Sequence, residues 1–384
     1  MSTNTRYHSV DALRGLLLMI MAIDHSSAVI ARQHASEFWA GAMSAYTDAF
    51  PFLTRWITHL CAPGFFFLMG AGIYWSAAAR EHAGDSPLEI LRRTVWRGFA
   101  IFLSGQVFET GIFIAMSKLK PAAVSLNVIS AAPPNDGSSV EFALIVLSGL
   151  GLVMMACGLL LRLAPWAWLL VSALCVLATN SLLPSSGRPG AMWEAILLTP
   201  GISQHLLATY PVIPWLAAAA AGMYFAYWWQ SDTDHASQRV WMVGGVLVLV
   251  GVALRVAGGW GNIRAPRDSG WIEFLNNVKY PPSLVFLCFS LGINLVLLGL
   301  LIRLPEKFRS GRSPLLVFGQ TPLFFYIAHF YLLILCAFVF FKEAASLEGA
   351  YVVWAVLLVV LYPLCAWYRR FKMSKPRESL WRMF

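Results

Sequence analysis

Four ionisable side chains interrupt an apolar stretch near the N-terminus, residues 6–31, RYHSVDALRGLLLMIMAIDHSSAVIA. They are Asp11, Arg14, Asp24 and His25. An ionisable group in hydrocarbon is energetically costly, so such groups inside a membrane segment are candidates for a functional site. The imidazole of His25 can act as a general base near neutral pH, and the guanidinium of Arg14 matches the geometry of a phosphate. The stretch therefore carries groups for proton transfer and for binding an anionic ligand.

The spacing of these residues places most of them on one side of a helix. Arg14 and His25 are eleven residues apart. On a helix their directions around the axis differ by only about 20°, and they are separated by roughly 16 Å along it. Asp11 lies about 40° from His25 by the same geometry and can pair with Arg14 as an i, i+3 neighbour. Asp24 points about 100° away from His25, so an acid from another helix would orient His25 better. Because lipid cannot satisfy this polar stripe, we expect Arg14 and His25 to face one common chamber inside the protein.

The composition requires a membrane setting for these residues. The chain has 384 residues, of which 58% are hydrophobic and 12% are charged, with a mean hydropathy of +0.65; soluble domains have about 25% charged residues. We therefore predict an all-α, polytopic helix bundle forming a single domain over residues 1–384. The net charge of +9 comes from short loops between apolar runs, which indicates membrane topology rather than nucleic-acid binding. The six cysteines lie in apolar stretches without a CxxC motif, so neither a disulfide framework nor a thiolate metal site is expected.

Ten apolar runs are near or above the length of a spanning helix. They cover residues 9–31, 57–79, 96–116, 141–163, 165–183, 206–229, 239–258, 282–303, 315–341 and 349–368. With ten spans, most Lys and Arg fall on the side of the two termini, which predicts that both termini are cytoplasmic. Arg14 then lies near the cytoplasmic boundary and His25 lies toward the opposite face.

Three further polar residues interrupt these runs. Glu109, in GQVFETG, lies among phenylalanines and must be paired or protonated. It either packs as an ion pair with an arginine or is an acid that orients His25. His59, in RWITHLCAPG, and His329, in GQTPLFFYIAHFY, are either satisfied core histidines or part of the same site. None of the histidines has a second ligand at helical spacing, so no metal site is predicted.

Lys279 and Tyr280, in FLNNVKYPPSL, precede the eighth apolar run. Lys and Tyr at a membrane boundary commonly anchor a helix in the interface. The alternative interpretation is that they line an acceptor site on the face opposite the termini.

Several of these motifs together resemble a known family. The segments SVDALRG…MAIDH, THLCAPGFFFLMG, YPVIPW, KYPPSL and FGQTPLFFYIAHFY are similar to bacterial members of the heparan-α-glucosaminide N-acetyltransferase catalytic-domain family, within the transmembrane acyltransferases. The resemblance covers most of the chain. The spacing from Arg14 to His25 also matches the arginine–histidine spacing of integral-membrane acyltransferases.

The resemblance implies an activity and a location. It implies that acetyl-CoA or another acyl-CoA binds from the cytoplasm, and that the acyl group passes to a hydroxyl or amine of a saccharide or cell-envelope acceptor. The protein would lie in a bacterial inner membrane and would use no metal. A homodimer is left open. In the animal lysosomal enzyme the proposed active histidine lies in the following segment, nearer to His34, and an asparagine stands at the place of His25. Assigning the chemistry to His25 therefore follows the wider acyltransferase motif.

The leading hypothesis is an acyltransferase in which His25 is the general base or acyl relay, assisted by Glu109 or Asp24. Arg14 and Asp11 would serve the donor, and His59, Lys279, Tyr280 and His329 would serve the acceptor. The alternative is a proton-coupled transporter, because buried His, Glu and Arg residues also form proton relays. A third option is a non-catalytic membrane scaffold, for which the sequence offers no positive sign.

Overall fold

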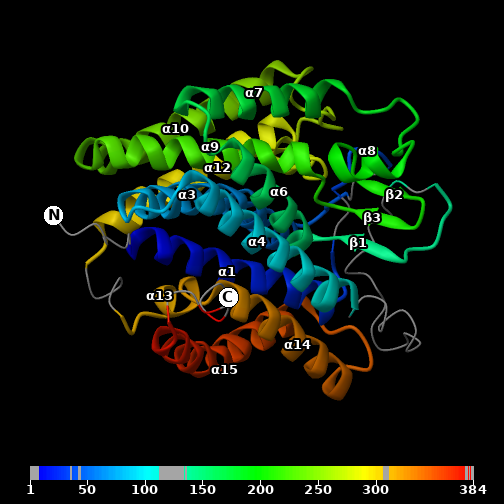
Figure 1. Cartoon of the computed structure of the whole chain (residues 1–384). Coiled ribbons are helices and arrows are strands. Elements are labelled where there is room, and N and C mark those ends of the chain that lie inside the picture. The colour runs from blue at the N-terminus through cyan, green and yellow to red at the C-terminus, as the bar shows by residue number, and fades with distance from the viewer. Residues whose placement is uncertain are drawn as a thin grey trace.

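Helices form most of the structure (Figure 1), a computed structural model that describes residues 8–34, 37–41, 45–111, 134, 136–305, 311–376, 379 and 381. The N-terminal half has the elements α1 (His8–Val29), α2 (Ala49–Ile57), the 3₁₀ turn η1 (Thr58–Leu60), α3 (Cys61–His82), α4 (Pro87–Ser104), the π-helical turn η2 (Gly105–Thr110), β1 (Phe142–Leu144), α6 (Val146–Leu160), α7 (Pro165–Ser181) and α8 (Met192–Leu197). The remaining elements are β2 (Gly201–Ser203), β3 (Leu206–Ala208), α9 (Val212–Ser231), α10 (Thr233–Ala257), α11 (Trp271–Leu275), α12 (Leu284–Arg303), α13 (Pro314–Gly319), α14 (Pro322–Phe340) and α15 (Leu347–Ser374).

A small sheet departs from the predicted all-α class. Its strand order is β1-β3-β2, with β1 parallel and β2 antiparallel to β3. Figure 1 shows it with α8 at one end of the bundle. The chain leaves its helices there, and pairing of short strands satisfies backbone N–H and C=O groups that a helix would otherwise satisfy internally.

Each of the ten predicted apolar runs contains helical residues, but among the described residues six helical segments are long and apolar enough to cross a bilayer. These are His8–Val29, Ala49–His82, Thr233–Ala257, Leu284–Arg303, Pro322–Phe340 and Leu347–Ser374. The helices α6 and α7 have 15 and 17 residues, shorter than the roughly 20 residues that a spanning helix needs. The protein is thus a polytopic helical membrane protein, and the count of ten spans stays a prediction.

Helix α1 occupies the middle of the bundle. It contacts α13, α14 and α15 on one side and α3 and α12 on others. In Figure 1 it lies between the layer of α13 to α15 and the layer that contains α3 and α4. The polar residues of α1 therefore face protein rather than lipid, as their cost in hydrocarbon requires.

Glycines allow α1 and α13 to pack backbone to backbone. A methyl group built on Gly15 would lie 1.9 Å from the carbonyl oxygen of Leu315, and one built on Gly319 would lie 1.8 Å from that of Asp11. Small residues commonly permit such close helix approach in membranes. This contact fixes the end of α13 beside the Asp11–Arg14 turn of α1.

Two helical irregularities position further polar residues. Glu109 lies in the π-helical turn η2, a conformation that is rare and often found at functional sites. The break between α13 and α14 ends at Pro322, which occupies the first turn of α14 because its ring is compatible with a helix start. Tyr326 and His329 then follow within the first turns of α14.

Candidate functional site

Arg14 is held by α1 itself and by the end of α13. Its Nη1 donates to Asp11 Oδ1 at 2.8 Å and to the carbonyl oxygen of Gly319 at 3.1 Å. The predicted i, i+3 pair is therefore confirmed. The guanidinium keeps part of its surface free, with 23% of the side chain exposed, so the pair leaves it able to bind a ligand.

A cavity of about 320 Å³ opens beside Arg14, and we call it the Arg14 cavity. Among the described residues that line it, Arg14, Arg97 and Lys372 are cationic and none is acidic. Arg97, on α4, is exposed and has no ion-pair or hydrogen-bond partner in the described part of the chain. The remaining lining residues are chiefly apolar, and include Leu18, Met21, Phe65, Leu68, Met69, Ile73, Ile101, Val146, Leu147, Leu150, Met154, Leu323 and Tyr326. The cavity thus combines positive charge with a long apolar wall.

His25 makes a direct contact with His329 that the sequence did not specify. His25 Nδ1 lies 2.7 Å from His329 Nε2, and the two rings stack with 5.0 Å between centroids and an angle of 11°. His329 is fully buried, whereas His25 is partly exposed. Two polar residues on different helices are thereby brought together in the core of the bundle.

The hydrogen bonds of this pair fix its neutral tautomers. His329 Nδ1 lies 3.0 Å from the carbonyl oxygen of Phe325, which can only accept, so His329 carries its proton on Nδ1. Its Nε2 is then an acceptor, and His25 must donate from Nδ1. Among the described residues the Nε2 atom of His25 has no hydrogen-bond partner and keeps its lone pair, as in sites where a second group orients a histidine base.

The expected common chamber for Arg14 and His25 is divided in the structure. Helix α1 contributes Leu18 and Met21 to the Arg14 cavity, and His25 is not among the residues lining it. Tyr326 lines this cavity, and its ring centroid lies 6.3 Å from that of His25. Arg14 contacts the end of α13 and His25 contacts α14, so the expectation of one chamber shared by the two residues was wrong.

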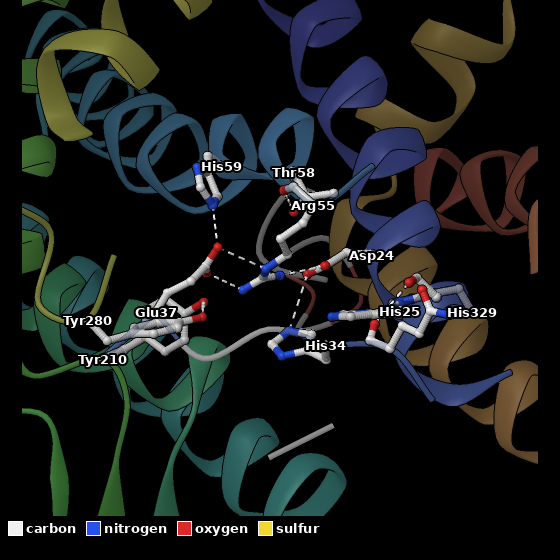
Figure 2. Close-up of polar contacts among 12 residues, drawn as sticks. Asp24, His25, His34, Glu37, Arg55, Thr58, His59, Tyr210, Tyr280 and His329 are labelled. Atoms are coloured by element: carbon white, nitrogen blue, oxygen red, sulfur yellow. Dashed lines mark hydrogen bonds and ion pairs between the residues drawn. The ribbon is translucent and has the colours of Figure 1, made fainter. Parts of the chain in front are cut away.

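A buried charge cluster surrounds Arg55 (Figure 2), which lies between Glu37 and Asp24. Arg55 Nη1 donates to Asp24 Oδ1 at 2.5 Å, and its Nε donates to Glu37 Oε1 at 3.0 Å. Its Nη2 also contacts Glu37, and His59 Nε2 bonds to the same carboxylate. Asp24 and His59 are thus occupied by this cluster, and neither is hydrogen-bonded to His25.

The loop residue Glu37 is held in its charged form by these partners. Burial alone would raise the pKa of Glu37, but the Arg55 charge and the contact with His59 hold that pKa well below its usual range. An isolated carboxylate at this depth would instead be protonated. The cluster is consequently a fixed arrangement of opposite charges.

His34 lies beside the Asp24 carboxylate in Figure 2. Its Nε2 is 3.9 Å from Asp24 Oδ2, and its buried Nδ1 has no hydrogen-bond partner among the described residues. Burial, with the nearby Arg55 charge adding to it, lowers the pKa of His34 from 6.5 to about 3. His34 is therefore a neutral imidazole at pH 7 with an unused nitrogen.

A second cavity, the Arg55 cavity, lies beside this histidine and has a volume of about 260 Å³. It is lined by Asp24, Ser27, Gln33, His34, Tyr46, Pro51, Thr54 and Arg55. Its wall is polar, in contrast to that of the Arg14 cavity. Helix α1 contributes Met21 to the Arg14 cavity and Asp24 and Ser27 to the Arg55 cavity, and His25 lines neither of them.

Glu109 contacts Tyr326 rather than His25 or an arginine. Tyr326 Oη donates to Glu109 Oε1 at 2.5 Å, and the backbone N–H of Leu147 donates to the same carboxyl at 3.1 Å. Glu109 is 8% exposed. Its link to the histidine pair runs through Tyr326, whose ring is 5.5 Å from that of His329.

Lys279 and Tyr280 lie inside the protein, with exposures of 3% and 8%. The hydroxyl of Tyr280 is 3.1 Å from that of Tyr210, and the backbone N–H of Lys279 donates to the carbonyl oxygen of Glu37. Such burial is incompatible with an interfacial anchor, so this part of the sequence interpretation was wrong. Both residues instead adjoin Glu37 of the charge cluster, whose carbonyl oxygen accepts from their backbone N–H groups.

No group of three or more His, Cys, Asp or Glu side chains among the described residues could hold a metal ion. The sequence interpretation missed Arg55, Glu37 and Tyr326, and it named His34 only through the family resemblance. Arg55, Glu37 and His34 lie outside the predicted apolar runs, where charge has no cost that would mark it, and Tyr326 is one of several aromatic residues in its run. Arg55 alone had a signal in the sequence, because it lies just before the apolar run at residues 57–79. Helix α2 begins before that run and carries Arg55 into the bundle.

The fold and the site define a class of protein: a polytopic helical membrane protein with a histidine pair between α1 and α14 and with two cavities lined in part by α1. The chain belongs to a family within this class. Residues 6–254 match the model of the heparan-α-glucosaminide N-acetyltransferase catalytic family, which confirms the resemblance and indicates a membrane acetyltransferase. The match includes Arg14, His25 and Glu109, and ends before Lys279 and His329. A comparison with curated proteins finds no significant match.

Proposed function

We propose that this protein transfers an acetyl group from acetyl-CoA, or another acyl group from its CoA thioester, to a hydroxyl or amine of a saccharide or cell-envelope acceptor. The observation that carries the proposal is the His25–His329 contact, which orients the imidazole of His25 and leaves its Nε2 without a hydrogen-bond partner among the described residues. A family match to an N-acetyltransferase catalytic domain supports the reaction class. The acceptor class follows the wider resemblance.

The Arg14 cavity is the donor site in this proposal. Arg14, Arg97 and Lys372 supply cations suited to the phosphates of CoA, since guanidinium groups bind phosphate oxygens through charge-assisted hydrogen bonds. The apolar wall suits the pantetheine arm, whose thioester would point toward Tyr326. Asp11 orients Arg14 for this role.

His25 is the general base or transient acyl carrier. With Nδ1 committed to His329, its Nε2 can take the proton of the acceptor as the new bond to the acetyl carbon forms. General-base assistance of this kind contributes about 10²–10⁴ in rate. Asp24 acts only indirectly, because its carboxylate is paired with Arg55.

His34 is a second candidate for the same step. Its unpartnered Nδ1 and its position in the wall of the Arg55 cavity favour a base that meets the acceptor there, with Asp24 beside it. His59, Lys279 and Tyr280 would then shape the acceptor side through the Glu37 cluster. A single-turnover experiment with radiolabelled acetyl-CoA and no acceptor distinguishes a general base from an acyl relay, because only a histidine that carries the acyl group retains label on the protein.

We place the protein in a bacterial inner membrane as one catalytic domain over its full length, with both termini cytoplasmic. The Arg14 cavity then opens toward the cytoplasm, where CoA thioesters are found. Lys372 in α15 and Arg97 in α4 line the same cavity end as Arg14, in keeping with the excess of positive charge expected on that side. A homodimer would fit the proposal without being required by it.

The alternative function is proton-coupled transport through the buried His, Glu and Arg residues. Purified protein in detergent separates the two, because an enzyme turns over acetyl-CoA with no membrane gradient and a transporter does not. Release of free CoA with formation of acetylated hexosamine supports the proposal. Complete absence of turnover in detergent, together with gradient-driven uptake in proteoliposomes, would overturn it.

A further inference from the structure

One of the described residues that line the Arg14 cavity, Tyr326, carries a hydroxyl group, and the acid Glu109 is hydrogen-bonded to that hydroxyl. Tyr326 lines the cavity, and its Oη is 2.5 Å from Glu109 Oε1. The cationic residues Arg14 and Lys372 contact the turn at Gly319 and Gln320, which precede Tyr326 by seven and six residues on the chain. A ligand whose anionic end met these cations would bring its other end to the tyrosine.

Glu109 is in an environment that favours a carboxylic acid. It is 8% exposed, and its hydrogen-bond partners in the described chain are Tyr326 and the backbone N–H groups of Leu147 and Ser148. No Lys or Arg forms an ion pair with it among the described residues. A buried carboxyl group without a cation tends to hold its proton, because burial penalises the charged form. The structure has Tyr326 Oη as the donor to Glu109; with the carboxyl group protonated, the same contact would run from the carboxyl O–H to the phenol oxygen.

Resting on the proposed function, we infer that Tyr326 protonates the departing CoA sulfur and that Glu109 resupplies the proton. The acceptor nitrogen or oxygen forms a bond to the acetyl carbon as the carbon–sulfur bond breaks, and the electron pair of that bond goes to sulfur. Sulfur takes the proton of Tyr326 Oη, Tyr326 takes the proton of Glu109, and Glu109 becomes a carboxylate held by the Leu147 N–H. The proton that the acceptor loses goes to the histidine base on the other side, so charge and protons balance.

Other polar residues of the cavity suit this step less well. The guanidinium groups of Arg14 and Arg97 do not release protons at physiological pH, and the ammonium of Lys372 lies 3.4 Å from the carbonyl oxygen of Gln320, at the other end. Tyr326 is a catalytic residue in this inference, whereas Glu109 acts through it as a positioning and proton-supplying residue. The π-helical turn η2 directs Glu109 toward α14.

The test compares acetyl-CoA with acetyl-selenocoenzyme A, which differs by one atom and occupies the cavity with the same nucleotide. A selenol is a much stronger acid than a thiol, so its anion leaves without a proton donor. We expect Tyr326→Phe to lower kcat about 10²-fold with acetyl-CoA, the size of general-acid assistance, and less than fivefold with the selenoester. Glu109→Gln should show the same selective loss, with KM changed less than threefold in both variants.

Tyr331→Phe is the matched control, because Tyr331 lies on the same helix, is 44% exposed and packs against Phe108. It should leave kcat unchanged with both donors. An unchanged kcat in Tyr326→Phe, or an equal loss with both donors, would overturn the inference. If Tyr326→Phe fails to fold, Glu109→Gln decides the question alone by the same ratio. A wild-type protein inactive with both donors would contradict the proposed function instead.

Discussion

His25 Nδ1 and His329 Nε2 lie 2.7 Å apart, and the carbonyl oxygen of Phe325 lies 3.0 Å from the other nitrogen of His329. This chain of contacts joins α1 to α14 across 304 positions of sequence. It turns one imidazole into an oriented group and leaves its Nε2 available. His329→Phe keeps an aromatic ring but removes the acceptor for His25, so we expect kcat to fall about 10²-fold with little change in KM. Steady-state kinetics with acetyl-CoA measures this, and an unchanged kcat would show that His329 does not orient His25.

Arg97 should contribute to donor binding without affecting the chemical step. Loss of one charge-assisted hydrogen bond to phosphate corresponds to about a tenfold change in affinity. Arg97→Gln should therefore raise KM for acetyl-CoA about tenfold at constant kcat, and weaken the dependence of KM on salt. Arg92→Gln is the control, because Arg92 is exposed on the same helix and does not line the cavity. Equal effects from the two variants would contradict this donor site.

Arg55 should be essential for stability. It is 6% exposed and neutralises both Asp24 and Glu37. Its replacement by alanine leaves two buried carboxylates without a cation, which costs about 3–5 kcal/mol in unfolding free energy. Arg80→Ala removes a more exposed ion pair with Asp85 and should cost less than about 1 kcal/mol. Thermal unfolding in detergent compares them, and similar midpoints for the two variants would argue against a structural charge cluster.

Stability should fall in acid through His34. Its pKa is about 3 in the folded protein against 6.5 for an ordinary histidine, so the unfolded chain binds the extra proton below pH 6.5. The contribution of His34 is therefore fully present at neutral pH and is lost as pH falls from 6.5 toward 3. His34→Gln should reduce the loss of stability between pH 7 and pH 5 by about 2 kcal/mol. Identical pH dependence in the wild type and the variant would mean that His34 is protonated or exposed in the fold.

The sequence predicted the helical bundle and the special character of α1 for physical reasons. Apolar length defines a spanning helix, and the cost of burying Arg14, Asp24 and His25 marks α1 as a segment enclosed by protein. The Asp11–Arg14 pair followed from helical spacing alone, because i, i+3 neighbours on a helix lie close together. Apolar length, helical periodicity and i, i+3 pairing are local properties of a segment, and the structure shows the helices and the Asp11–Arg14 pair that they predict.

The tertiary partners could not be predicted from one sequence. The contact of His25 with His329 and that of Glu109 with Tyr326 join segments 304 and 217 positions apart, and nothing in the helical periodicity specifies which helices pack together. Glu37 and His34 lie in a loop, where a polar residue is ordinary and gives no signal. The partners of Arg14 and His25 on α13 and α14 are residues that a wheel of α1 alone does not include.

The most direct test of the central claim is acetyl transfer by purified His25→Ala protein in detergent. The matched control is His235→Ala, because His235 is an exposed histidine in the first turn of α10, paired with Asp232. The account predicts a loss of at least about 10²-fold in kcat for His25→Ala, at normal expression and thermal stability, and wild-type kcat for His235→Ala. Undiminished acetyl transfer by His25→Ala would contradict it.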